Sequence, residues 1–275
     1  MKSAFDRTAV AKYALVLVAA LAACGARAGL DWTGALDGAQ RSEANRARDT
    51  FRHPRQTLEF FGLEPGMTVV EIAPGGGWYT EVLAPLLRGN GTLYAAHYSL
   101  NPPNAYYRNS LGRFLQKLAA DSELYDGVVV TQLQPPAQAL AAPAGSADLA
   151  LAFRSVHSWM RADTLAPTLG AIYAALKPGG RFGLVQHRAQ PGTSVADMKR
   201  TGYVTEAYVI AAAEKAGFEL VERADINANP KDSADHPKGV WNLPPALRDG
   251  GKRRDHYLAI GESDRMTLLF AKPAP

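Results

Sequence analysis

The stretch Val69–Val82, VVEIAPGGGWYTEV, decides the fold. A short apolar run leads to Glu71, a proline follows, and the consecutive glycines 75–77 precede a segment with a helical pattern. Glycine at the seam between a strand and a helix allows a tight turn and a close approach of ligand to backbone. The free N–H groups of the following helix can also bind an anion. The stretch therefore predicts a strand, a turn and a helix, with a ligand site at the turn.

Strand and helix patterns alternate along the rest of the chain. Helices are expected at 78–89, 110–120, 163–180 and 205–218. Seven strands are expected at 67–73, 91–98, 127–133, 148–156, 181–187, 219–226 and 265–272. Such alternation implies an α/β fold, a doubly wound and mostly parallel sheet covered by helices on both faces. The last two strands have no helix pattern between them, so the last strand is expected to pair antiparallel.

Two segments are expected beyond residue 28. Residues 63–275 form a Rossmann-like domain, and residues 29–62 form an N-terminal helical segment with helices at 41–50 and 53–62. Within the domain, the connection 227–264 is long and carries four prolines. Loops of that length are usually functional or mobile.

The first 28 residues read as an export signal. Three basic residues precede or flank the apolar run Ala14–Ala23, which is shorter than the roughly 20 residues that a membrane span needs. Leu21–Cys24 resembles a bacterial lipoprotein box, so cleavage before Cys24 and lipidation of this single cysteine are expected. Ordinary cleavage after Ala28 is the alternative. The expected location is the periplasm or the outer membrane, with a lipid anchor on Cys24.

Composition and charge exclude some classes of function. The chain has 275 residues, 47% of them hydrophobic and 20% charged, which suits one sizeable core. The formal charge of +4 falls to +2 once the first 23 residues are removed. This excess is too small to indicate nucleic-acid binding, and no basic stripe with interleaved aromatic residues is present.

Three kinds of glycine loop fit the turn to different degrees. A phosphate-binding P-loop ends in Gly-Lys-Ser/Thr, but here Trp78 and Tyr79 follow Gly77. A dinucleotide fingerprint fits Gly75 and Gly77 but meets Thr80 where a small residue belongs. The third pattern keeps the charge of the strand and reads acidic-x-Ala-x-Gly-x-Gly.

This third pattern resembles motif I of the class I S-adenosylmethionine-dependent methyltransferases, with Ala73 in place of the first glycine. ALKPGGRF at Ala175–Phe182 is similar to the turn before the fifth strand of that family. GGGWYTEVLAP, FRSVHSWM and GYVTEAYVIAAAEKAGF look like a bacterial group of predicted exported methyltransferases. The resemblance covers residues 55–272.

The resemblance implies S-adenosylmethionine as the cofactor. Its binding residues would be those of the glycine turn and the end of the second strand: Glu71, Ala73, Gly75, Gly76, Gly77 and His97. The family places an acid after the second strand for the ribose hydroxyls, and residues 94–110 contain none. His97, Ser99 or Asn101 would substitute. In the alternative interpretation, the glycines serve only helix–sheet packing.

Histidines are the candidate catalytic residues. His97, His157 and His187 are each expected at the carboxyl end of a strand, where ligands bind in this class of fold. We expect His157 and His187 to act as general bases, since histidine titrates near neutral pH. Capping of strand ends is the alternative role. No acidic residue has metal-ligand spacing with them, so no metal site is expected.

Two further residues are candidates for substrate binding. Arg154 precedes His157 by three residues and would orient an anionic group, or else pair with Asp163 at the surface. Tyr79 would line an apolar cavity beside the turn, or else belong to the core.

The sequence therefore predicts an exported S-adenosylmethionine-dependent methyltransferase of a small-molecule acceptor. Methyl transfer depends mainly on alignment of the acceptor, so the lack of a nucleophile motif does not oppose it. A non-catalytic envelope binding protein with a degenerate cofactor crevice is the alternative. A nicotinamide-dependent oxidoreductase is a third hypothesis, which Thr80 and the missing acid oppose.

Overall fold

The structure is a computed structural model that describes residues 29–102, 104–248 and 251–274. The predicted signal peptide and the lipidation of Cys24 lie outside the described residues. Within those ranges, no helix combines the length and the apolar character needed to span a membrane.

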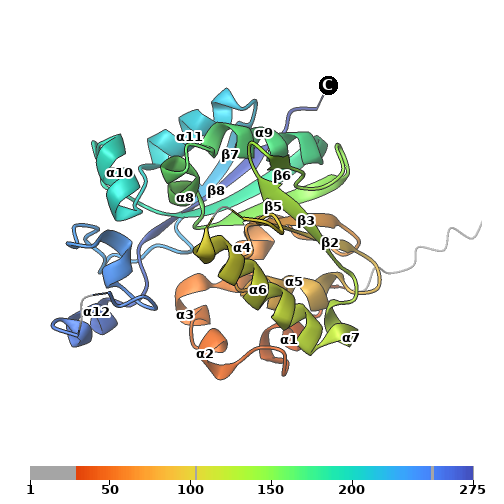
Figure 1. Cartoon of the computed structure of the whole chain (residues 1–275), viewed down its shortest axis with the longest axis horizontal. Coiled ribbons are helices and arrows are strands. Elements are labelled where there is room, and N and C mark those ends of the chain that lie inside the picture. Colours follow the sequence, from red (N-terminus) through yellow and green to blue (C-terminus); the bar gives the residue numbers. More distant parts are fainter. Residues whose placement is uncertain (1–28, 103, 249–250, 275) are drawn as a thin grey trace, which may run out of the picture.

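The described residues build one eight-stranded sheet in the order β4-β3-β2-β1-β5-β6-β8-β7 (Figure 1). The strands are β1 (Thr68–Ile72), β2 (Thr92–His97), β3 (Val128–Gln134), β4 (Gln138–Ala139), β5 (Ala147–Phe153), β6 (Leu176–His187), β7 (Glu219–Ala224) and β8 (Arg265–Ala271). Strands β1, β2, β3, β5 and β6 run parallel, whereas β8 is antiparallel to both β6 and β7. The predicted fold class is confirmed, with the short β4 added at the edge beside β3.

Helices cover both faces of the sheet. The N-terminal helices are α1 (Trp32–Asp37), α2 (Glu43–Arg46), α3 (Asp49–Arg52) and α4 (Pro54–Phe60). The others are α5 (Thr80–Leu87), α6 (Ala105–Ala120), α7 (Ser122–Tyr125), α8 (Val156–Arg161), α9 (Leu165–Ala175), α10 (Val195–Thr201), α11 (Glu206–Lys215) and α12 (Arg254–Ile260), with a 3-10 helix η1 (Gly239–Asn242). Residues of α8, α9 and α11 form the core on one face, and residues of α1, α4 and α5 form the core on the other.

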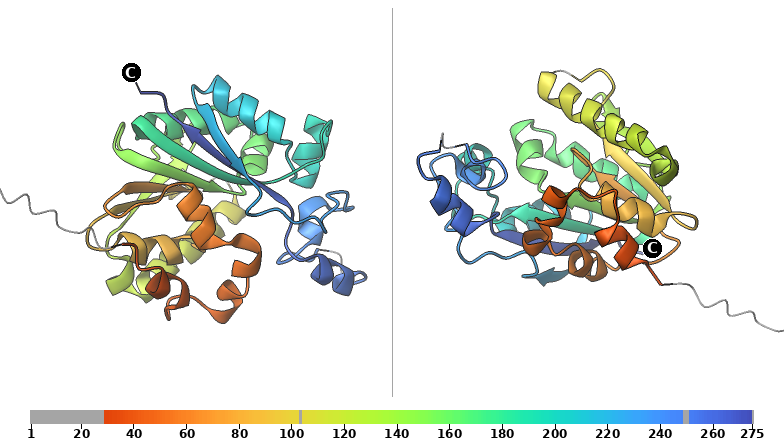
Figure 2. Two further views of the ribbon diagram at one scale, coloured as in Figure 1. Left: turned by 180° about the vertical axis from the view of Figure 1, so that it is seen from behind. Right: turned by 90° about the horizontal axis from the view of Figure 1, so that it is seen from below.

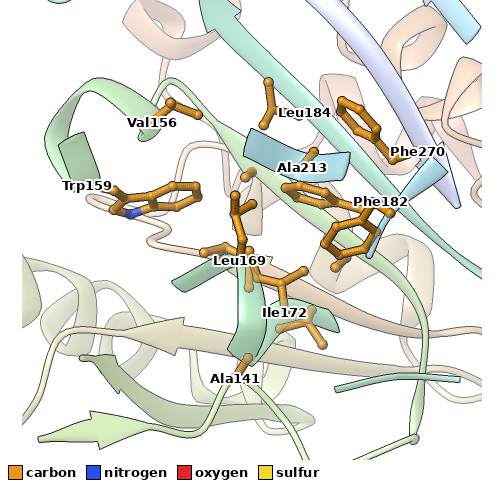
Figure 3. Close-up of a cluster of buried hydrophobic side chains, with 14 of the residues drawn as sticks. Ala141, Val156, Trp159, Leu169, Ile172, Phe182, Leu184, Ala213 and Phe270 are labelled. Atoms are coloured by element: carbon orange, nitrogen blue, oxygen red, sulfur yellow. The ribbon is translucent and has the colours of Figure 1, made fainter. Parts of the chain in front are cut away.

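Strand β5 shows why the sheet was readable from the sequence. Leu149 and Leu151 are buried in one core, whereas Ala150 and Ala152 are buried in the other, because successive side chains of a strand point to opposite faces. A strand buried on both faces is therefore apolar throughout. Figure 3 shows the second of these cores, where side chains of α9 lie against Phe182 of β6.

The N-terminal helices share this core with the domain. Phe61, which follows α4, is completely buried against β6. A Cβ on Gly183 would lie 2.4 Å from the ring of Phe61, so this strand position requires glycine. Figure 2 shows these helices packed along the domain, and the segment with α12 projecting at the other side.

Several predicted boundaries were wrong. The helix predicted at 163–180 ends at Ala175, because Gly179 and Gly180 exchange backbone hydrogen bonds with Lys272 at 2.9 and 2.8 Å and thereby extend the sheet. The strand predicted at 148–156 ends at Phe153, because Arg154 takes a left-handed conformation with φ of 58°.

Other differences concern helices. The helix predicted at 41–50 is broken into α2 and α3. The predictions did not include α8 and α10. The connection 227–264 contains η1 and α12, and Leu243 and Tyr257 of this connection pack in a small core of their own.

Candidate functional site

The glycine turn after β1 presents bare backbone on one side. Ala73, Gly75 and Gly77 all have left-handed conformations, with φ of 51°, 62° and 78°. A Cβ on Gly75 or Gly76 would meet no protein atom within 4 Å, whereas a Cβ on Gly77 would lie 2.9 Å from Cδ of Lys117. Gly75 and Gly76 therefore leave room for a ligand, and Gly77 is required by the packing of α6 on the turn.

A cavity of about 470 Å³ lies beside the turn, at the carboxyl ends of β1, β5 and β6. It is lined by most of the residues predicted from the sequence: Glu71, Ala73, Gly75, Gly76, Tyr79, Arg154, His157 and His187. Gly77 and His97 do not line it. Residues of the connection 227–264, including Val240, Trp241 and Leu243, form another wall, so this connection lies at the site.

Glu71 is the only acidic residue among the described residues that line this cavity. Its side chain is buried and accepts a hydrogen bond from the hydroxyl of Thr80 at 2.6 Å. Burial raises the pKa of Glu71 to about 7. The hydrogen bond from Thr80 partly offsets this rise, and the negative charge of the nearby Glu81 adds to it. A cation placed next to Glu71 would lower this pKa and favour the ionised carboxylate.

His97 is hydrogen bonded to the backbone of the glycine turn. The backbone N–H of Tyr98 donates to Nδ1 of His97 at 2.7 Å, so the ring proton is on Nε2, which donates to the carbonyl of Gly75 at 3.0 Å. Both nitrogens are thus used and the side chain is fully buried, and burial lowers its pKa. This geometry favours a positioning role for His97 over direct contact with a ligand.

Tyr98, which directly follows β2, places an aromatic ring where the resemblance implies an acidic residue. Tyr98 lines the cavity, whereas the backbone N–H and the hydroxyl of Ser99 both donate to Gln134. Tyr98 and Trp159 also line an adjoining cavity of about 220 Å³, together with Tyr107 and Pro135. This slot between apolar and aromatic side chains suits a flat ring.

His157 and His187 are neighbours, with ring centroids 5.5 Å apart. The amide nitrogen of Gln186 donates to the carbonyl of Gly202 at 3.0 Å and lies 3.3 Å from Nδ1 of His157, which places the His157 proton on Nε2. Nδ1 of His187 lies 2.5 Å from the hydroxyl of Ser263. Burial, with Arg161, lowers the pKa of His157 to about 3, and burial, with His157, lowers that of His187 well below its usual value. Both rings are neutral at pH 7.

Tyr79 lines the cavity with its aromatic ring. Its ring stacks on Phe153 with centroids 3.4 Å apart and an interplanar angle of 8°. Burial raises the pKa of the Tyr79 hydroxyl to about 12, although Arg52 opposes the rise. Tyr79 therefore offers the cavity a neutral aromatic surface.

Neither a protein-family model nor a curated protein sequence matches the chain. By contrast, many solved structures match the fold of this chain. A methyltransferase dependent on S-adenosylmethionine from Aquifex aeolicus is 14% identical, with a TM-score of 0.55 over 82% of this chain and 93% of that one. The fold is that of the S-adenosylmethionine-dependent methyltransferases.

Two other structures with this methyltransferase fold have different descriptions. The 4+2 cyclase SpnF is 18% identical, with a TM-score of 0.57 over 86% of this chain and 85% of that one. A protein from Bordetella parapertussis, described as a possible exported protein, is 15% identical, with a TM-score of 0.50 over 83% of this chain and 68% of that one.

The methyltransferase fold brings four arginines to the cavity: Arg48, Arg52, Arg154 and Arg265. Arg48 and Arg52 donate to the two carboxylate oxygens of Glu262 at 2.6 and 3.0 Å, and Arg265 also donates to Glu262. Burial would raise the pKa of Glu262, but the surrounding arginines, Arg265 foremost, hold it well below its usual range.

Only Arg154 of this cluster is predicted from the sequence. Arg52 and Glu262 are 210 positions apart, and no local pattern marks either. Asp163, the surface partner considered for Arg154, pairs instead with Lys199 at 2.7 Å. Among the described residues, no three His, Cys, Asp or Glu side chains gather as a metal-binding set.

Proposed function

We propose that this protein is an S-adenosylmethionine-dependent methyltransferase that is exported to the cell envelope and acts on a small-molecule acceptor. The observation that carries the proposal is the bare backbone at Gly75 and Gly76 beside a cavity of about 470 Å³. Because no protein atom fills the space over these glycines, a ligand can lie against the backbone.

The residues present fit most parts of the cofactor. Glu71 would face its ammonium group, and the backbone at Gly75 and Gly76 would support its methionine part. The slot between Tyr98 and Trp159 would take the adenine ring. Glu71 is the only carboxylate among the described lining residues and would be used by the ammonium group, so Tyr98 would stand where the usual acid meets the ribose.

The bound cofactor would supply an activated methyl group, and the protein would then align the acceptor and accept a proton. Of the two neutral rings, His187 is better placed to accept the proton, although burial lowers its pKa. If its Nδ1–H donates to Ser263, its Nε2 carries a free lone pair. The proton of His157 lies on Nε2, so His157 would donate a hydrogen bond to the acceptor.

Export is proposed from the first 28 residues. The leader pattern and the lipoprotein-like sequence at Leu21–Cys24 support transfer across the inner membrane and a lipid anchor on Cys24. The description of the Bordetella parapertussis protein as a possible exported protein agrees with this proposal. The protein would then work in the periplasm or on the outer membrane.

A non-catalytic binding protein remains the second candidate. It is favoured by Tyr98, which stands where an acid would bind the ribose, and by Ser99, whose hydroxyl is already bonded to Gln134. The fold-level similarity to SpnF, which is described as a cyclase, also agrees with other uses of this crevice.

Calorimetric titration of the purified protein with S-adenosylmethionine, S-adenosylhomocysteine and NAD separates these functions. Binding of the first two, without NAD, is the expected result. Binding of NAD alone would indicate an oxidoreductase, and binding of none of them would favour the binding protein.

A further inference from the structure

We propose that the acceptor carries an oxyanion group with at least two negative charges, bound by Arg154 together with its neighbours in an arginine cluster. The cluster is Arg48, Arg52, Arg154 and Arg265. This inference rests on the proposed methyltransferase function and names the substrate class of the same site.

The charge balance of the cavity is the first argument. Four guanidinium groups line it, and the only carboxylate bonded to them is that of Glu262, among the described residues. Glu262 therefore serves three arginines at once, and even with Glu71, which also lines the cavity, at least two positive charges are not offset. Buried charges are stable only when they are paired or hydrogen bonded, so the site as described lacks an anion.

The cofactor does not supply the missing charge. S-adenosylmethionine carries one carboxylate but also an ammonium and a sulfonium group, so its binding adds a net positive charge. The excess of at least two positive charges in the cavity therefore persists when the cofactor is bound. An acceptor with at least two negative charges would offset that excess.

Arg154 is the arginine most clearly held for a ligand. Its guanidinium group lines the cavity and is affected there by Arg265 and Glu262 through charge alone, with no hydrogen bond or ion pair among residues 29–102, 104–248 and 251–274. Its pKa is lowered by burial and by Arg265 to about 10, so the group is still protonated at neutral pH. Arg154 also has a φ of 58°, a left-handed conformation that glycine adopts without strain. Residues held in such conformations cluster at ligand sites.

Arg52 gives an independent indication. The residue is 2% exposed, and both of its terminal amino nitrogens are buried without a hydrogen-bond partner among the described residues. Its stacking on Trp78, at 4.6 Å from the ring centre, leaves the in-plane N–H groups free. Such donors in a buried site require an acceptor such as a phosphate or a carboxylate oxygen.

A second cavity, of about 360 Å³, adjoins the main cavity and is lined by two further arginines, Arg161 and Arg248. It shares His157, Ser158 and Trp241 with the main cavity. Arg161 and Arg248 lie against Trp241, at 4.7 and 5.9 Å from its ring. An anionic acceptor would therefore be attracted along this route toward His157 and His187.

The test is a calorimetric titration of the purified protein with malonate and with inorganic phosphate, at constant ionic strength, both with and without saturating S-adenosylhomocysteine. We expect one anion per protein, and at least a tenfold loss of affinity in Arg154→Gln and Arg154→Gly. The glycine variant relieves the left-handed strain, so its melting temperature should not fall. Arg223→Gln, which removes an exposed arginine of β7, should bind the anion within twofold of the wild type.

Three results would overturn the proposal. They are the absence of binding by both anions, undiminished binding in both Arg154 variants, and anion binding that saturating S-adenosylhomocysteine abolishes. The last would assign the arginines to the cofactor carboxylate. The proposed function fails separately, if the wild-type protein does not bind S-adenosylhomocysteine.

Discussion

The hydroxyl of Thr80, the first residue of α5, donates to the carboxylate of Glu71 in β1 at 2.6 Å. This bond joins the strand before the glycine turn to the helix after it. Both side chains are buried, and burial raises the pKa of Glu71 from 4.5 to about 7. The acid at the centre of the site therefore titrates near neutral pH.

Glu71 should make the free protein less stable as the pH rises. The folded state holds the proton more tightly than the unfolded state, so its stability is greatest below pH 4.5 and falls as the pH rises to about 7. A shift of this size corresponds to about 3 kcal/mol. We expect Glu71→Gln to remove this loss, measured as the difference in urea unfolding free energy between variant and wild type at pH 5 and pH 8.

The exposed Glu64 provides the control, because Glu64→Gln should leave the pH dependence unchanged. A difference between Glu71→Gln and wild type that stays constant from pH 5 to pH 8 would show that Glu71 titrates normally.

Ala73 should be a strained residue. Its φ of 51° is a conformation in which an L side chain costs about 1 kcal/mol relative to glycine. We expect Ala73→Gly to stabilise the protein by about that amount, measured by thermal unfolding. The same change at Ala174, on the exposed face of α9, should destabilise by about 1 kcal/mol, because glycine weakens helices. Destabilisation by Ala73→Gly would mean that the turn is not strained.

Glu262 should be the most sensitive ionic residue of the site. Glu262→Gln leaves Arg48, Arg52 and Arg265 around a neutral group, and breaking a buried ion pair in this way costs about 3–5 kcal/mol. Glu59→Gln breaks only the exposed pair with Arg55 and should cost less than about 1 kcal/mol. Urea unfolding of the two variants compares them directly, and equal losses would contradict the buried network.

The predicted lipid anchor can be tested in cells. Cys24→Ser should abolish incorporation of labelled palmitate and release the protein from the membrane fraction into the periplasm. Labelling that persists in the variant would exclude Cys24 as the acylated residue, and a wild-type protein found only in the cytoplasm would exclude export.

The centre of the sheet was predictable because strands such as β1 and β5 are buried on both faces and therefore apolar, as Leu149–Ala152 illustrate. Most residues of the turn, together with His157 and His187, line the cavity because strand ends gather at one edge of a parallel sheet, whereas Gly77 and His97 do not line it. The partners of these residues were not predictable. The sequence located His97 at the end of a strand, but only the fold shows that both of its nitrogens are bonded within the protein.

The other arginines of the cluster were not predicted because they come together only through long-range contacts. Arg52 comes from the N-terminal helices and Arg265 from the last strand, and they meet only because α3 packs beside the start of β8 through Glu262. Similarly, the end of β5 depends on the left-handed Arg154, a conformation that no sequence pattern indicates.

The central claim is that a cofactor lies on the bare backbone of the glycine turn, and Gly76→Val tests it most directly. Gly76 does not have a left-handed φ and its Cβ would meet no protein atom, so valine should leave the melting temperature unchanged. Gly77→Val is unsuitable, because its side chain would strike Lys117 and Phe114. Gly127→Val is the matched control. Gly127 directly precedes β3, at the amino ends of the parallel strands and away from the site, and its Cβ would also meet no protein atom. Titration with S-adenosylhomocysteine should show at least a hundredfold weaker binding to Gly76→Val and normal binding to Gly127→Val. Equal affinity of the folded Gly76→Val variant and the wild type would contradict the account.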